Sequence, residues 1–146
     1  MEHSTITLPE AKSIITVSQH HDVACLPRPV SHSNDYIKPL LEVGADGMLI
    51  QMVNNSEDVK KLIGSIKYPP IGNRSYGANR AQGYGFDFDS YINKWNNDSI
   101  FMIQIESIEG VKNIESILSY DEIQDFLKDK YNNVHEKQKE EKDKDF

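Results

Sequence analysis

Apolar residues along the chain follow two patterns, one with helical spacing and one with continuous runs. The motif Thr7-Leu8-Pro9-Glu10 reads as a capping box with an early proline, which predicts the start of a helix. Further helices are expected over residues 34–41 (with Pro39 inside), 56–66 and 111–118, and around Tyr91 and Trp95. The continuous apolar runs at 23–26, 47–53 and 100–105 read as three buried strands.

The predicted strands alternate with the predicted helices along the chain. Each strand is apolar at successive positions, a pattern typical of strands covered on both faces. This order predicts a parallel sheet in an α/β fold, built from about three βα units. A loop rich in glycine and proline is expected over about residues 68–85.

The sequence changes character after about residue 119. Apolar residues at helical spacing predict a C-terminal helix over about 120–134, whereas residues 135–145 contain no apolar side chain. We expect this last stretch to be a frayed or disordered charged tail. The chain is therefore divided into a domain at 1–122 and a divergent, helical and charged tail at 123–146.

Composition narrows the classes of protein that fit. The 146 residues suit one domain, and the net charge of −7 argues against non-specific nucleic-acid binding and docking on anionic membranes. No apolar run approaches the ~18–20 residues that span a bilayer. The single cysteine, Cys25, fits a reducing compartment, and no secretory signal is visible. A cytoplasmic protein is expected.

Polar side chains follow the predicted strands, where parallel α/β proteins gather functional groups. Arg28 follows the first strand, Gln51 ends the second, and Gln104 and Glu106 end the third. His3 precedes the first helix. A base, a cation and a carboxylate on one face could polarise and deprotonate a small keto acid.

Each of these residues also has a plainer interpretation. His3 could be a surface histidine, Arg28 an ion-pair residue, and Glu106 a cap of the following helix. Arg74 and Arg80 in the glycine-rich loop could bind an anion, although the loop has no Walker or Rossmann pattern.

Several motifs in the same order resemble one known family. They are Glu2-His3, Arg28 followed by Ile37-Lys38, the segment Gly44-Ala45-Asp46-Gly47, the loop Tyr68-Pro69-Pro70-Ile71-Gly72-Asn73-Arg74 with Arg80-Ala81, and Gln104-Ile105-Glu106 followed by Glu109-Gly110-Val111. From about residue 2 to 122, the chain resembles the HpcH/HpaI aldolase/citrate lyase family. The Tyr-Pro-Pro loop and the Gln-Ile-Glu strand, at the right spacing, make the resemblance specific.

The resemblance implies a TIM barrel and a class II pyruvate aldolase. Such an enzyme cleaves a 2-keto-3-deoxy or 4-hydroxy-2-oxo acid to pyruvate and an aldehyde, through an enolate held on a divalent cation (Mg²⁺, Mn²⁺ or Co²⁺). It implies that Glu106 is a metal ligand and that Gln104 lines the substrate site. It further implies that Arg28 binds the keto acid oxygen and that His3 is the acid or base.

Departures from the family pattern predict an incomplete site. The family's second metal ligand lies in a Gly-Pro-x-Asp-Leu segment, but Gln124-Asp125-Phe126-Leu127-Lys128 does not match it. The acidic partner of the family histidine would precede residue 1, and Gln51 stands where many members have proline. A complete TIM barrel takes ~250 residues, so a partial, truncated barrel is expected.

Three functions therefore stay open. The first is the aldolase, incomplete in this chain, with a small keto acid as substrate. The second is a non-catalytic remnant whose uncovered strand edges favour self-association or a complementary chain. The third is an acyl-CoA lyase relative in which Arg74 and Arg80 hold the phosphates.

Overall fold

The computed structural model describes residues 1–123. The tail expected at 123–146, apart from Ile123, lies outside them, as does most of the helix expected at 120–134. The elements in chain order are α1 (Leu8–His20), α2 (Asn34–Glu42), β1 (Gly47–Ile50), α3 (Ser56–Ile66), the 3₁₀ helix η1 (Arg80–Gly85), α4 (Phe88–Asp98), β2 (Ile100–Ile103), α5 (Ile108–Lys112) and α6 (Ile114–Ile117). No helix in this part of the chain is long and apolar enough to cross a membrane.

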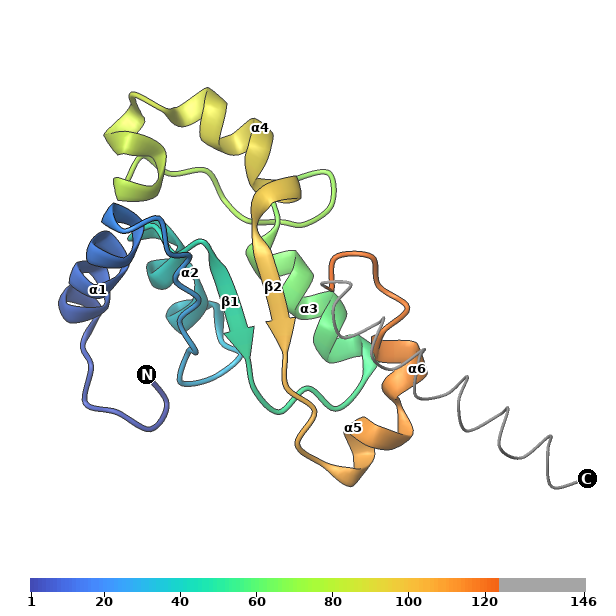
Figure 1. Cartoon of the computed structure of the whole chain (residues 1–146). Coiled ribbons are helices and arrows are strands. Elements are labelled where there is room, and N and C mark those ends of the chain that lie inside the picture. Colours follow the sequence, from blue (N-terminus) through green and yellow to red (C-terminus); the bar gives the residue numbers. More distant parts are fainter. Residues whose placement is uncertain (124–146) are drawn as a thin grey trace, which may run out of the picture.

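The two strands form a parallel sheet at the centre of the molecule, with α1 on one side and α5 and α6 at the other end (Figure 1). The register pairs Gly47 with Ile100 and Ile50 with Ile103. The expected parallel α/β arrangement is therefore confirmed, and both strands end at the same edge of the sheet.

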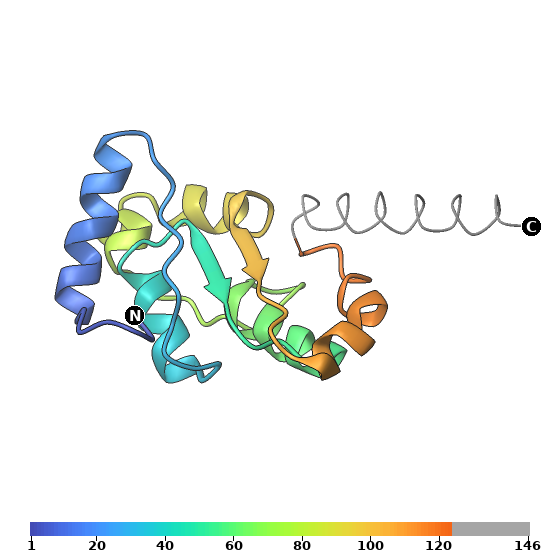
Figure 2. The ribbon, with the colours of Figure 1, turned by 60° about the horizontal axis from the view of Figure 1, so that its bottom comes forward.

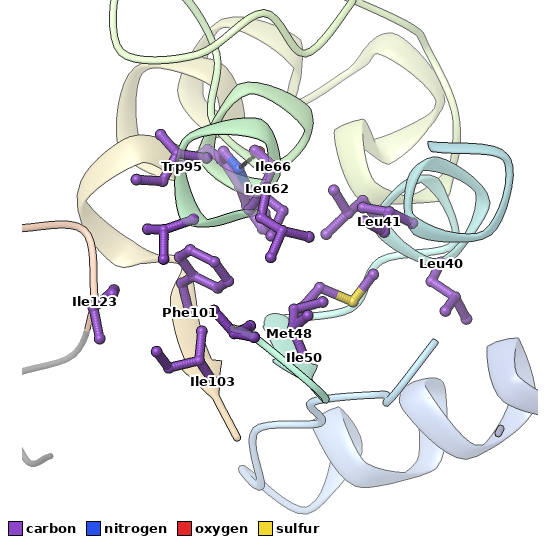
Figure 3. Packing of buried hydrophobic residues seen from close by; sticks show 14 of the residues in the cluster. Leu40, Leu41, Met48, Ile50, Leu62, Ile66, Trp95, Phe101, Ile103 and Ile123 are labelled. Carbon is purple, nitrogen blue, oxygen red and sulfur yellow. Dashed lines mark hydrogen bonds between the residues drawn. The ribbon is translucent and has the colours of Figure 1, made fainter. Parts of the chain in front are cut away.

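One face of the sheet is buried beneath helices, and the other is not fully covered. Met48 and Ile50 of β1 and Phe101 of β2 are buried, and they pack with apolar side chains of α2 and α3 (Figure 3). Leu49 and Met102 alternate with them and are only half-buried. Because side chains alternate across a strand, the uniform apolar runs predicted two covered faces, but within residues 1–123 only one is sealed.

The strand expected at residues 23–26 is not formed, which is a correction to the sequence analysis. Val23 is 56% exposed, and the segment runs beside β1 in an extended form (Figure 2). Two backbone hydrogen bonds join it to the residues around β1, from Asp46 N to Cys25 O (3.1 Å) and from Leu49 N to Pro27 O (3.3 Å). Pro27 has no N–H to donate in return, so the ladder cannot continue.

Helix boundaries follow local capping chemistry. The capping box of Thr7 and Glu10 is present at the start of α1, as predicted. Helices α2 and α3 begin at residues 34 and 56, as expected, and are capped by the residues just before them, Ser33 and Asn55. The helix expected over 111–118 is instead two short helices that meet at Asn113, and the first of them is capped by Ser107.

Arg74 anchors the long loop to the core. Its side chain is 1% exposed, and Nη2 lies 3.0 Å from Oε1 of Glu42 on α2. The guanidinium carbon is 4.6 Å from the ring centre of Tyr68 and 4.7 Å from that of Trp95, and Nη1 donates to the Tyr91 hydroxyl (3.2 Å). This buried cation is therefore a structural residue, held by one carboxylate and an aromatic cluster.

Arg80 is also engaged by protein acceptors. Its Nη1 donates to the Val43 carbonyl (3.0 Å) and its Nη2 to Gln19 Oε1 (2.9 Å). These contacts and the burial of Arg74 contradict the expectation that the two arginines of the loop form an anion cradle.

Candidate functional site

Gln104 brings the candidate residues together at the carboxyl edge of the sheet. It follows β2 directly, and its backbone N–H donates to Ile50 O (2.7 Å) while its carbonyl accepts from Val53 N (3.2 Å). These bonds continue the strand pairing past the end of β2. The Gln104 side chain is thereby fixed at the edge where parallel α/β proteins place functional groups.

The guanidinium of Arg28 lies between two oxygen acceptors. Nη1 donates to Gln104 Oε1 (2.9 Å), and Nη2 lies 2.8 Å from Glu2 Oε2. The Arg28 side chain remains 24% exposed. The sequence predicted that Arg28 and Gln104 would converge, and the structure places them in direct contact.

Glu2 and His3 lie on the N-terminal segment beside Arg28. His3 Nε2 is 3.6 Å from Glu2 Oε2, and its side chain is 76% exposed. Sequence reasoning missed the contact of Glu2 with Arg28, although an acidic residue next to a candidate histidine was an available signal. A single carboxylate thus joins the candidate base to the candidate oxygen-binding cation.

Glu106 is exposed and is oriented by the backbone of the segment after β1. Its Oε2 accepts a hydrogen bond from Met52 N (3.1 Å), and Met52 has a φ of 51°. Glu106 does not cap α5, because Ser107 occupies that position and accepts from Gly110 N (3.0 Å). The interpretation of Glu106 as a helix cap is therefore wrong, and its carboxylate faces solvent near the strand ends.

The ligand needs of a divalent cation show whether these groups form a complete metal centre. Mg²⁺ and similar ions take about six oxygen ligands, usually with carboxylates among them. Within residues 1–123, no group of three or more His, Cys, Asp or Glu side chains could hold a metal ion. The Gln104 amide oxygen accepts from Arg28, which takes one of its two lone pairs. The described residues therefore do not make a cation site by themselves.

Gln51 and His32 form a second layer behind Arg28. Gln51 is 4% exposed, and its Nε2 donates to Pro29 O (2.9 Å). His32 Nε2 lies 2.6 Å from the Gln51 carbonyl, and since a carbonyl can only accept, the histidine donates. The sequence placed Gln51 at a strand end. It gave no role to His32, because His32 is not part of any recognisable motif.

Two titratable groups outside this cluster offer no alternative site. Burial raises the pKa of the Cys25 thiol, which disfavours the reactive thiolate. Burial also lowers the pKa of Lys67, whose ammonium is held by Asn96 O (2.8 Å), Ser99 O (3.3 Å) and Ser99 Oγ (2.7 Å). Its three donors already have acceptors, so Lys67 is a structural residue.

Adjacent parallel strands, with helices on one face and polar groups at their carboxyl edge, define part of a TIM-type α/β barrel. A solved HpcH/HpaI aldolase from Desulfitobacterium hafniense matches 84% of this chain and 48% of its own, with a TM-score of 0.75 and 26% identity. A family protein from Burkholderia cenocepacia superposes with a TM-score of 0.78 at 21% identity, which supports the fold alone. The partial TIM barrel expected from the sequence is confirmed.

The family model described as HpcH/HpaI aldolase/citrate lyase matches residues 1–126, and the chain belongs to this family. A relative named 2-keto-3-deoxy-L-rhamnonate aldolase, from Klebsiella pneumoniae, is 35% identical over 98 residues. That match covers 66% of this chain and 36% of the relative. The proteins of the same name from Salmonella strains are 34% identical over 98 residues. The chain thus spans about a third of the length of these curated relatives.

Proposed function

We propose that the chain supplies one part of the active site of a metal-dependent carbon–carbon lyase. The reaction is cleavage of a 2-keto-3-deoxy or 4-hydroxy-2-oxo acid to pyruvate and an aldehyde. The observation that carries this proposal is the placement of Arg28, half-buried and held by two acceptors at the carboxyl edge of the sheet. The name of the 2-keto-3-deoxy-L-rhamnonate aldolase relatives is consistent with such a substrate.

Arg28 would bind the keto oxygen of the substrate and stabilise the negative charge that develops there. A guanidinium has five N–H donors in one plane, and its contacts with Gln104 and Glu2 fix that plane. A cation held rigidly beside a developing oxyanion lowers the barrier because it needs no reorientation during the reaction. Gln104 would line the same site and hold Arg28 in place.

His3 would move the proton between the substrate and solvent. Its ring is exposed and close to Glu2, so it can exchange protons with water and be oriented by the carboxylate. Deprotonation of pyruvate at its methyl group gives the enolate that such an enzyme joins to an aldehyde. In cleavage, His3 would return the proton to the methyl carbon of that enolate.

Glu106 would contribute one ligand of a divalent cation (Mg²⁺, Mn²⁺ or Co²⁺), the cofactor class of this proposal. Its exposed carboxylate suits these ions. When bound, the ion supplies a Lewis acid for the keto group. Further ligands would come from outside residues 1–123 or from another polypeptide, because the described residues leave the set incomplete.

That incomplete ligand set favours a second candidate, a non-catalytic fragment that associates with itself or with a complementary chain. The third candidate, an acyl-CoA lyase, finds less support. Arg74 is buried against Glu42, and Arg80 is bound to Val43 and Gln19, so neither is poised to cradle phosphates.

The test is exchange of the methyl protons of pyruvate in heavy water, followed by NMR with Mg²⁺ or Mn²⁺ or without added metal. This partial reaction needs no aldehyde. We expect metal-dependent exchange that disappears in Glu106→Gln. The matched control is Glu115→Gln, the same change at an exposed position in α6, which should exchange like the unmodified chain. No exchange from folded protein would refute aldolase chemistry by this chain alone and leave the non-catalytic fragment.

A further inference from the structure

The backbone on either side of Arg28 has no N–H group to donate to a neighbouring strand. Arg28 lies between Pro27 and Pro29, and neither proline has an N–H group. The backbone bonds from the 23–29 segment to the β1 region end at Leu49 N to Pro27 O. Ladder bonding therefore ends at the Pro27 carbonyl, in the peptide just before Arg28, and the next carbonyl, that of Arg28, accepts from the N-terminal ammonium of Met1 (2.8 Å).

Gln51 adds a contact from the end of β1, beyond the point where the ladder stops. Its amide Nε2 donates to the Pro29 carbonyl (2.9 Å), one residue after Arg28, and the bond is buried. The Gln51 backbone carbonyl accepts from His32 Nε2 (2.6 Å), three residues further along the same loop. Side chain and backbone of one residue thus hold the Arg28 loop at two points.

The Gln51 side chain is not well adapted to a purely stabilising role. Its Oε1 is buried and has no hydrogen-bond partner among the described residues. A buried acceptor without a donor is costly, and an apolar side chain of the same size would avoid that cost. The feature that an apolar residue could not reproduce is the hydrogen bond from Nε2 to Pro29 O.

We propose that Gln51 is a positioning residue, which orients Arg28 toward Gln104 and Glu2 by holding the Pro29 carbonyl. Its significance for turnover rests on the function proposed above for Arg28. The orienting role itself concerns this chain's own side chains and can be measured without substrate.

The substrate-free test uses arginine side-chain NMR in Gln51→Met, which keeps the length of the side chain but removes the N–H donor. The chain has three arginines, at positions 28, 74 and 80, so three Nε–Hε signals are expected, and Arg28→Lys assigns one. We expect the heteronuclear NOE of the Arg28 signal to fall sharply while that of Arg74 stays high. The urea midpoint should stay the same or rise, because the unpartnered Oε1 is removed as well.

Gln19→Met is the matched control at the opposite end of β1. Gln19 Nε2 donates to Gly44 O (2.8 Å), and its Oε1 accepts from Arg80 Nη2 (2.9 Å). This variant should loosen Arg80 and leave Arg28 unchanged, the reverse of Gln51→Met. An Arg28 signal that is equally rigid in Gln51→Met would overturn the proposal, as would a lowered urea midpoint with all three signals altered together.

Pyruvate exchange separates this inference from the function on which it rests. If the unmodified chain exchanges pyruvate protons, Gln51→Met should lower the maximal rate by about tenfold, the effect of roughly one lost hydrogen bond. An unchanged rate would remove Gln51 from the reaction. If the unmodified chain shows no exchange, aldolase chemistry by this chain alone is refuted, and the NMR comparison still decides whether Gln51 orients Arg28.

Discussion

Replacing Arg74 should destabilise the fold more than any surface substitution, because it leaves a carboxylate without its partner. Arg74 and Glu42 lie 3.0 Å apart, with the arginine side chain 1% exposed. Removing one member of a buried ion pair costs about 3–5 kcal/mol, since the remaining charge stays desolvated. Two aromatic rings within 5 Å of the guanidinium carbon add to the loss. Against a typical total of about 5–15 kcal/mol, Arg74→Met removes a large share of the stability.

The assay is urea denaturation of Arg74→Met, Glu42→Met and the double variant. Trp95 is the only tryptophan and is buried against Arg74, so its fluorescence reports on this region, and circular dichroism serves as an independent probe. The double variant should lose less than the sum of the single losses, because it leaves no unpaired charge. It also keeps the comparison possible if Arg74→Met does not fold.

Arg80→Met is the matched control for this reasoning. The acceptors of Arg80, Val43 O and Gln19 Oε1, are neutral, so its removal leaves no isolated charge. The free energy of unfolding should fall by about 1–2 kcal/mol. A cost below about 1 kcal/mol for Arg74→Met, in the range of an exposed pair, would refute the argument. Equal costs for the two arginine variants would show that lost packing, and not the stranded carboxylate, sets the magnitude.

Three further outcomes are expected. Burial raises the pKa of Tyr91 to about 12 from 10.0, so between these pH values the unfolded chain has released a proton that the folded chain retains. Stability should then fall as pH rises, by at most about 1.4 kcal/mol per pH unit, and less steeply in Tyr91→Phe. Lys67→Met should lower the free energy of unfolding, measured with urea, by about 2–3 kcal/mol, because the two buried oxygens of Ser99 lose a charged donor. An unchanged free energy of unfolding would contradict this. Arg28→Ala should weaken pyruvate binding, followed by NMR titration, by more than about 1–3 kcal/mol, and unchanged affinity would make Arg28 a surface residue.

Local chemistry explains which parts of the fold the sequence could predict. Thr7 and Glu10 cap their helix through contacts within four residues, and this motif was interpreted correctly. The run at 23–26 has strand composition, yet strand formation depends on partners elsewhere in the chain, and Pro27 and Pro29 limit them. Sequence periodicity indicates which residues prefer burial, but it cannot supply a neighbouring strand.

In the candidate site, too, the sequence could predict some contacts and not others. Arg28 and Gln104 could be placed together because each follows an apolar run that was expected to be a strand, and parallel strands end at one edge. The contact of Glu2 with Arg28 and the hydrogen bond from Gln51 to Pro29 depend on side-chain geometry that no spacing rule encodes. The assignments of His3, Arg28 and Glu106 in the reaction therefore stay predictions until exchange is measured.

The pairing of β1 with β2 also has a consequence for the time at which the chain can fold. Gly47 pairs with Ile100, so the partner of β1 lies 100 − 47 = 53 residues further along. At a synthesis rate of about 5–20 residues per second, the ribosome needs roughly 3–10 s to make that stretch. During this interval the nascent chain carries Met48 and Ile50 without their sheet partner, and helix α3 has no completed sheet to cover. Until residue 103 emerges, these apolar side chains therefore stay accessible to a molecular chaperone that binds short apolar segments.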